Sequence, residues 1–179
     1  MLADRGALVI DFDELAHAVE EPDGPVWREI VQHFGRAILG ADRAIDRRKL
    51  GAVVFADREK LALLNRLVHP AVFAEWQRRI AQIRAARPDA IVLSDIPLLF
   101  EAALKPQVDL VLLVYIPPEE QIRRLMARNG YCRDEAMSRL ASQMPIDAKL
   151  PQTDIVIRND GSPEETHRAV DGLWEELRK

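Results

Sequence analysis

The chain has 179 residues, of which 48% are hydrophobic and 30% charged, so it can bury a core and is not a disordered polypeptide. Its formal net charge of −4 argues against a broad nucleic-acid-binding surface, and its single cysteine, Cys132, excludes an internal disulfide or a cysteine-rich zinc site. Its apolar runs are too short to cross a bilayer and no leader pattern is present, so we expect a cytoplasmic protein that binds neither membranes nor nucleic acids.

Short, nearly continuous apolar stretches predict buried parallel strands at residues 7–10, 90–93 and 110–115, with a weaker fourth at 155–157. Helical spacing predicts helices at residues 25–34, 57–67, 70–86, 118–129, 133–144 and 163–177. Strands that alternate with helices indicate a doubly wound α/β fold. The region 23–87 is helical throughout by pattern, and we predict that it is an insertion into a core formed by residues 1–22 and 88–179.

Two aspartates follow the first predicted strand, Asp11 and Asp13. Open α/β sheets bind ligands at this edge, where a carboxylate can accept a proton from an attacking hydroxyl or hold a magnesium ion. Alternatively, Asp13 caps a helix that begins at Glu14. The spacing alone leaves both interpretations open.

The segment 95–101 (Asp-Ile-Pro-Leu-Leu-Phe-Glu) follows the second predicted strand, and it either lines a substrate cleft or forms a proline-directed turn over core leucines. His69 lies just before a predicted helix, and it either faces the cleft or is an ordinary polar cap. Arginines gather on the two helices around Gly130, at positions 123, 124, 128, 133 and 139. Such a pair of helices can close over nucleotide phosphates, although any single arginine is as well explained by a solvated basic face.

Taken in order, these segments resemble the dephospho-CoA kinase family. The resemblance is carried by Gly-Ala-Leu-Val-Ile-Asp-x-Asp from Gly6, Asp-Arg-Arg-Lys-Leu from Asp46, His69-Pro70, Pro-Leu-Leu-Phe-Glu from Pro97, Arg128-x-Gly130, Arg139-x-x-x-Gln-Met-Pro, and Asn159-x-Gly161. It runs over essentially the whole chain, and it implies a P-loop-NTPase-like, three-layer parallel sheet with a helical substrate-side insertion and a lid at about residues 118–145.

The resemblance also implies roles for single residues. Asp13 would be the base that accepts the ribose 3′-hydroxyl proton of dephospho-CoA, with Asp11 in support. The dephospho-CoA side would be lined by Arg47, Leu50, His69, Pro70, Leu99 and Glu101. The ATP side would be served by Arg128, Arg139 and Asn159. ATP and Mg²⁺ are the implied phosphoryl donor and cofactor, and no metal ligand is assigned.

The sequence departs from the family pattern in one large respect. The family begins with a strand and a Gly-x-x-x-x-Gly-Lys-Ser/Thr loop, a segment of roughly 20 residues that this sequence lacks. We therefore predict that the chain as given is inactive or nearly so, and that it self-associates or recruits another segment to cover the missing strand. Smaller departures are Arg158 in place of an aspartate, Leu150-Pro151 in place of a basic pair, and Phe12 in a slot usually held by a small residue.

Three hypotheses remain at this point. The first is an incomplete form of a working dephospho-CoA kinase, the last enzyme of coenzyme A biosynthesis. The second is a non-catalytic relative that binds CoA or dephospho-CoA. A kinase for another nucleotide-like acceptor is the third, and the His69-Pro70 and Pro-Leu-Leu-Phe-Glu strings argue against it.

Overall fold

The protein was analysed as a computed structural model that describes all residues 1–179. Its contacts divide the chain into two compact units. The N-terminal unit is Ala7–Asp95, and the C-terminal unit consists of Met1–Gly6 and Ile96–Lys179. The predicted helical insertion falls within the N-terminal unit, together with the first two strands. The predicted domain boundaries remain a prediction.

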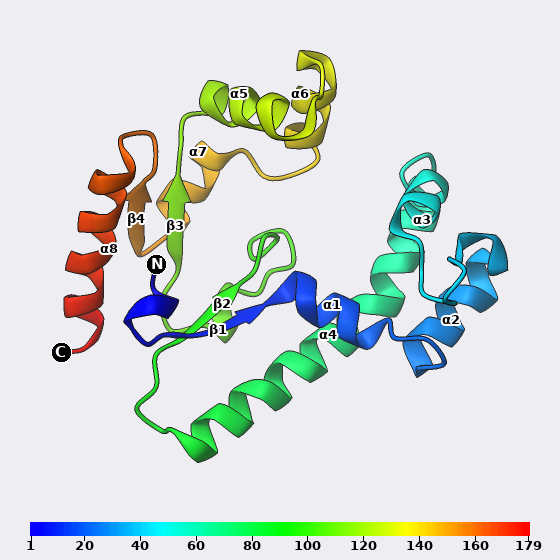
Figure 1. The fold of residues 1–179 in the computed structure, drawn as a ribbon, viewed down its shortest axis with the longest axis horizontal. Coiled ribbons are helices and arrows are strands. Elements are labelled where there is room, and N and C mark those ends of the chain that lie inside the picture. Colours follow the sequence, from blue (N-terminus) through cyan, green and yellow to red (C-terminus); the bar gives the residue numbers. More distant parts are fainter. The chain divides into compact units, whose positions relative to one another are not determined.

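The N-terminal unit pairs two parallel strands and gathers its helices along one long helix (Figure 1). Its elements are β1 (Leu8–Asp11), α1 (Phe12–Val19), α2 (Pro25–Phe34), a 3-10 turn (Arg36–Ile38), α3 (Arg47–Val54), α4 (Arg58–Ala86) and β2 (Val92–Asp95). Helices α1, α2 and α3 all contact α4. Aspartates begin three of the helices, because Asp11, Asp46 and Asp57 each accept backbone N–H groups of the following turn.

Helix α4 corrects the prediction of two helices at 57–67 and 70–86, because it continues past Pro70 without a break. Proline lacks the N–H that would bond the carbonyl four residues earlier, so an interior proline normally ends or bends a helix. Here Val68, Val72 and Trp76 recur every fourth residue and are all buried, which makes one apolar stripe that spans the proline. Packing of that stripe outweighs the lost hydrogen bond.

The C-terminal unit contains the other parallel pair and the remaining helices. Its elements are 3-10 turns at Ala3–Arg5, Lys105–Gln107 and Leu150–Gln152, strands β3 (Leu112–Tyr115) and β4 (Ile155–Arg158), and helices α5 (Pro118–Asn129), α6 (Arg133–Ala141), α7 (Ile146–Lys149) and α8 (Pro163–Leu177). Helix α8 lies along β4 (Figure 1) and begins with a capping box formed by Ser162 and Glu165. Helix α6 ends at Ala141, three residues before its predicted end at Met144.

The predicted parallel α/β character is confirmed, and the four strands form two separate pairs, β1 with β2 and β3 with β4. Parallel strands are normally covered on both faces. Here Val9, Val114 and Val156 on three of the strands are each about half exposed, at 48%, 53% and 43%. Apolar strand surface is therefore left uncovered in each unit. No helix is both long and apolar enough to cross a membrane.

Candidate active site

Three carboxylates gather where β1 and β2 end. Asp11 and Asp95 are register partners at the carboxyl ends of the two strands, and Asp13 follows in the first turn of α1. Asp95 is exposed at the end of β2, and its partial desolvation raises its pKa, which the negative charges of Asp11 and Asp13 raise further. The carboxylates are thus close enough to repel one another, as expected at the ligand edge of a parallel sheet.

The two aspartates of the Asp-x-Asp motif do different work. Asp11 caps α1, because its Oδ1 accepts the backbone N–H groups of Asp13 at 2.7 Å and Glu14 at 3.3 Å. The interpretation that Asp13 is the cap is therefore wrong. The Asp13 carboxylate is exposed and makes no hydrogen bond or ion pair with the protein, which leaves it available to a substrate.

Asp95 was missed as a site residue by sequence reasoning. The pattern placed it in a turn after the second predicted strand, and the signal that identifies it is the pairing of that strand with β1. Strand order is a tertiary property, so a single sequence does not reveal it.

His69 lies inside α4, directly before Pro70, so the alternative that it caps a helix is wrong. Its ring packs edge-on against Phe73, with centroids 6.2 Å apart. Partial burial lowers the pKa of His69, so the imidazole is neutral at pH 7. Phe12 packs edge-on against the same Phe73 and against Trp76, which places the bulky residue of the Asp-x-Asp motif in an aromatic cluster.

Arg47 stands in the first turn of α3 and donates to Glu20 Oε2 at 3.1 Å. Burial raises the pKa of Glu20, and Arg47 and His17 oppose that rise. The Arg47 side chain is about half exposed, at 49%, and so remains accessible to an anionic ligand. Leu50, on the same helix, belongs to the buried hydrophobic core, so its side chain does not face solvent.

Leu99 and Glu101 belong to a compact turn after β2. The turn is closed by backbone hydrogen bonds from Leu99 to Ile96 and from Leu104 to Leu99. Glu101 Oε1 accepts the backbone N–H of Met144 at 2.8 Å and lies 3.1 Å from Lys149 Nζ. The predicted cleft residue is therefore tied to the end of the predicted lid.

The predicted lid (residues 118–145) contains α5 and α6, which contact each other and turn at Gly130 in a left-handed conformation, φ 71°. Arg139 lies with its guanidinium 4.4 Å from the centre of the Tyr131 ring, and exposed Arg128 donates to the side chain of Asn129. Arg123, Arg124 and Arg133 are instead paired with glutamates of α5, through Glu120 and Glu119. Arg139 and Arg128 are thus the lid arginines without a carboxylate partner.

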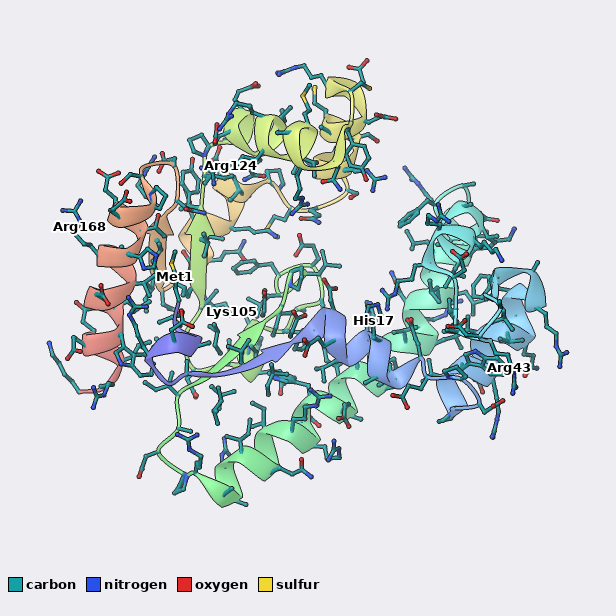
Figure 2. The ribbon with its side chains drawn as sticks, in the orientation of Figure 1. Met1, His17, Arg43, Lys105, Arg124 and Arg168 are labelled. Atoms are coloured by element: carbon teal, nitrogen blue, oxygen red, sulfur yellow. The ribbon has the colours of Figure 1, made fainter.

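Asn159 joins the lid to β4. Arg124, labelled in Figure 2, donates to the Asn159 carbonyl at 2.8 Å, while the Asn159 side-chain oxygen accepts the Thr166 hydroxyl at 3.2 Å. The unusual Arg158 pairs with Asp160 at 2.7 Å and lies over the Tyr115 ring. Its charge is therefore neutralised within its own turn.

Comparison with known proteins decides the family. The family model described as dephospho-CoA kinase matches residues 1–165. The chain is 55% identical over 179 residues to the dephospho-CoA kinase of Syntrophus aciditrophicus, covering all of this chain and 76% of the relative. It is 43% identical to that of Geobacillus kaustophilus, covering all of this chain and 90% of the relative. The chain belongs to the dephospho-CoA kinase family.

Solved structures agree with this assignment. A Thermus thermophilus protein superposes with a TM-score of 0.80 at 35% identity, and the Campylobacter jejuni dephospho-CoA kinase with 0.74 at 26% identity. Each comparison covers 98% of this chain and 87% of the other. Dephospho-CoA kinases are transferases whose substrates are ATP and dephospho-CoA, so the predicted enzyme class is confirmed.

The two units divide the predicted dephospho-CoA kinase residues between them. The N-terminal unit holds Asp11, Asp13, Arg47, Leu50, His69 and Pro70, and the C-terminal unit holds Leu99, Glu101, Arg128, Arg139 and Asn159. Within the first unit, the structure brings the aspartates together with Asp95, and His69 with the aromatic cluster. Within the second, it brings Glu101 to the lid and Asn159 to α5.

Proposed function

We propose that this protein transfers the γ-phosphoryl group of ATP to the ribose 3′-hydroxyl of dephospho-CoA, which yields CoA and ADP. The observation that carries the proposal is that only the first aspartate of the Asp-x-Asp motif is bound by the protein, while the second is free. Asp11 satisfies the start of α1, and Asp13 remains exposed and without a partner at the carboxyl end of β1. A carboxylate whose backbone is held in place, and whose oxygens make no hydrogen bond to the protein, can act as a general base.

In this proposal the Asp13 carboxylate accepts the proton of the attacking 3′-hydroxyl as that oxygen forms its bond to the γ-phosphorus and the bond to ADP breaks. Arg47 attracts the anionic groups of dephospho-CoA, and neutral His69 contributes a hydrogen bond beside Pro70. Arg128 and Arg139 neutralise charge on the transferred phosphoryl group. Asn159 lies in the turn that would face adenine.

Mg²⁺ is the cofactor that the family resemblance implies. Asp11, Asp13 and Asp95 offer carboxylate oxygens, the ligands that Mg²⁺ prefers, but no group of three or more His, Cys, Asp or Glu side chains is arranged to hold a metal ion. The residues present therefore do not form a metal site by themselves, and the ion, which would neutralise phosphate charge, has no assigned protein ligand.

The proposal extends to the fold that would hold the two substrates. We propose a P-loop-NTPase-like sheet in which residues 23–87 form the dephospho-CoA side. Residues 1–179 contain no Gly-x-x-x-x-Gly-Lys-Ser/Thr segment, the sequence that forms a backbone cradle for nucleotide phosphates. We propose that residues 1–179 by themselves bind dephospho-CoA but turn over ATP poorly, and that the exposed strand valines favour pairing with a further strand or a second copy.

A non-catalytic CoA-binding protein is the alternative, and the Arg158–Asp160 pair favours it because it replaces a family aspartate with a neutralised arginine. One experiment separates the two. Residues 1–179 and a version extended by the N-terminal segment of the Syntrophus relative are assayed for CoA and ADP formation, each beside an Asp13→Asn control.

The kinase proposal expects dephospho-CoA binding in both proteins and turnover that appears with the extension and disappears in Asp13→Asn. Binding of dephospho-CoA without turnover in the extended protein would support the non-catalytic alternative. Absence of dephospho-CoA binding in both would contradict both proposals.

A further inference from the structure

The Glu101 carboxylate is engaged by the protein's own groups at the end of the lid. Its Oε1 accepts the Met144 N–H at 2.8 Å and faces Lys149 Nζ at 3.1 Å. The Glu101 and Lys149 side chains are only 23% and 11% exposed, so no other ion pair of the chain has both partners so well shielded from water. Shielding from water reduces screening by salt and strengthens the pair.

The charge state of Glu101 fits this role. Burial alone would raise the pKa of Glu101, but hydrogen bonds from the backbone N–H groups of Met144 and of Glu101 itself, together with the Lys149 ammonium, hold it below its ordinary value. The carboxylate is therefore ionised under all physiological conditions and keeps both contacts.

Both contacts fall on the segment through which the chain leaves the lid. Met144 is next to the last lid residue, and Lys149 ends α7, where it also lies 5.9 Å from the Phe100 ring centre. On the same short helix, Asp147 accepts the Tyr115 hydroxyl at 2.9 Å, at the end of β3. The carboxyl-terminal end of the lid is thus fastened at two points, to the Glu101 turn and to β3.

Arg139 belongs to the lid whose carboxyl-terminal end these contacts hold. It lies over the Tyr131 ring at 4.4 Å, a contact between two lid residues, and it precedes Met144 by little more than one helical turn of chain. The hydrogen bond that fixes Met144 therefore also restricts the positions that the Arg139 guanidinium can reach.

We propose that Glu101 and Lys149 form a latch that fixes the carboxyl-terminal end of the lid and thereby positions Arg139 for phosphoryl transfer. Glu101 is then a positioning residue, beyond the acceptor contact that the family resemblance implies for it. The role of Arg139 rests on the proposed function, whereas the latch rests on the contacts of Glu101 alone. Glu101 Oε2 takes part in neither contact and remains available to a ligand.

The test measures lid mobility directly. Two readouts are used, amide hydrogen exchange of residues 142–150 and the mobility of a nitroxide on Cys132, the chain's single cysteine, which is exposed at the start of α6. Glu101→Ala is compared with Glu75→Ala, a matched control. Glu75 is similarly shielded at 20% and is also paired, with Arg78 and Arg79, but lies on α4 in the other unit.

The latch expects Glu101→Ala to raise exchange at the Met144 amide by about tenfold or more, because a hydrogen bond to a charged group is lost, and to mobilise the Cys132 label. Glu75→Ala should do neither. Two milder variants then separate charge from packing. Glu101→Gln keeps an acceptor for the Met144 N–H, and Lys149→Met keeps an apolar stem against the Phe100 ring.

If the ion pair between Glu101 and Lys149 holds the end of the lid, Glu101→Gln and Lys149→Met each raise amide exchange by a similar, partial amount. The double variant then exchanges no faster than either single variant. Additive effects would assign the contacts to packing and overturn the latch. The latch would also be overturned if Glu101→Ala left amide exchange and label mobility unchanged but weakened the binding of dephospho-CoA. Glu101 would then only contact the substrate. Failure of the wild-type chain to bind dephospho-CoA contradicts the proposed function instead, and the exchange comparison still decides the latch.

Discussion

Asp11 accepts the backbone N–H of Asp13 at 2.7 Å, so the first aspartate of the motif holds in place the residue that carries the second. The same oxygen accepts the N–H of Glu14. Asp13 is therefore fixed through its backbone while its carboxylate is left without a partner. Within three consecutive residues, Asp11 caps the helix and Asp13 keeps a free carboxylate for chemistry.

Substitution of Asp11 should cost more stability than substitution of Asp13. Asp11→Ala removes the cap of α1 and is expected to lower the free energy of unfolding by about 1 kcal/mol, the usual cost of a lost N-cap. Asp13→Asn should change that free energy by less than about 0.5 kcal/mol, as for most exposed positions. Urea denaturation followed by circular dichroism measures both, and a larger loss in Asp13→Asn than in Asp11→Ala would contradict this assignment.

Asp95 should make stability depend on pH in a defined direction. Its pKa is raised in the folded protein, first by burial and then by Asp11 and Asp13, so the folded state holds the proton more tightly than the unfolded state. Its contribution to stability is therefore present at low pH and is lost as pH rises from 3.8 through the raised folded pKa. Asp95→Asn should consequently stabilise the protein at pH 7 and give no gain at pH 3.

Thermal unfolding at the two pH values checks this prediction. The matched control is Asp109→Asn, an exposed aspartate outside the cluster. An equal gain from both variants at pH 7 would attribute the effect to net charge rather than to the cluster.

The sequence was sufficient for the elements whose signals are local. Helices α2, α5 and α8 begin with proline in the first turn and have the predicted bounds, because their start and stop signals lie within the helix or beside it. The continuity of α4 was not predictable in this way, since Val68, Val72 and Trp76 are buried by elements distant in sequence. The same holds for the site, where Asp13 was found by motif and Asp95 emerged only from strand pairing.

Ser94 should matter more than an ordinary serine. Its hydroxyl accepts the indole N–H of Trp76 at 2.9 Å, and Trp76 is only 4% exposed, so no water can readily replace that acceptor. Ser94→Ala is expected to lower the free energy of unfolding by about 1–3 kcal/mol, the cost of a buried donor left unpaired. Chemical denaturation measures this, beside Ser138→Ala on the exposed surface of α6, which should be nearly neutral.

Pro70 presents a case where stability and binding should move in opposite directions. Pro70→Ala restores a donor for the Arg66 carbonyl four residues earlier and removes the clash of the ring with it, so α4 becomes a regular helix. The free energy of unfolding should rise by roughly 1–3 kcal/mol. The same change alters the backbone that presents His69, whose ring packs on Phe73, so the affinity for dephospho-CoA should fall.

Thermal unfolding and titration calorimetry with dephospho-CoA measure the two effects of Pro70→Ala, and Ala74→Gly is the control because it changes α4 one turn later without touching the proline. The control should lose about 1 kcal/mol of stability, as glycine does inside a helix. A proline retained against its local cost is the pattern expected where the backbone serves a ligand. Pro70→Ala with higher stability and unchanged dephospho-CoA affinity would show that the proline is tolerated by packing alone.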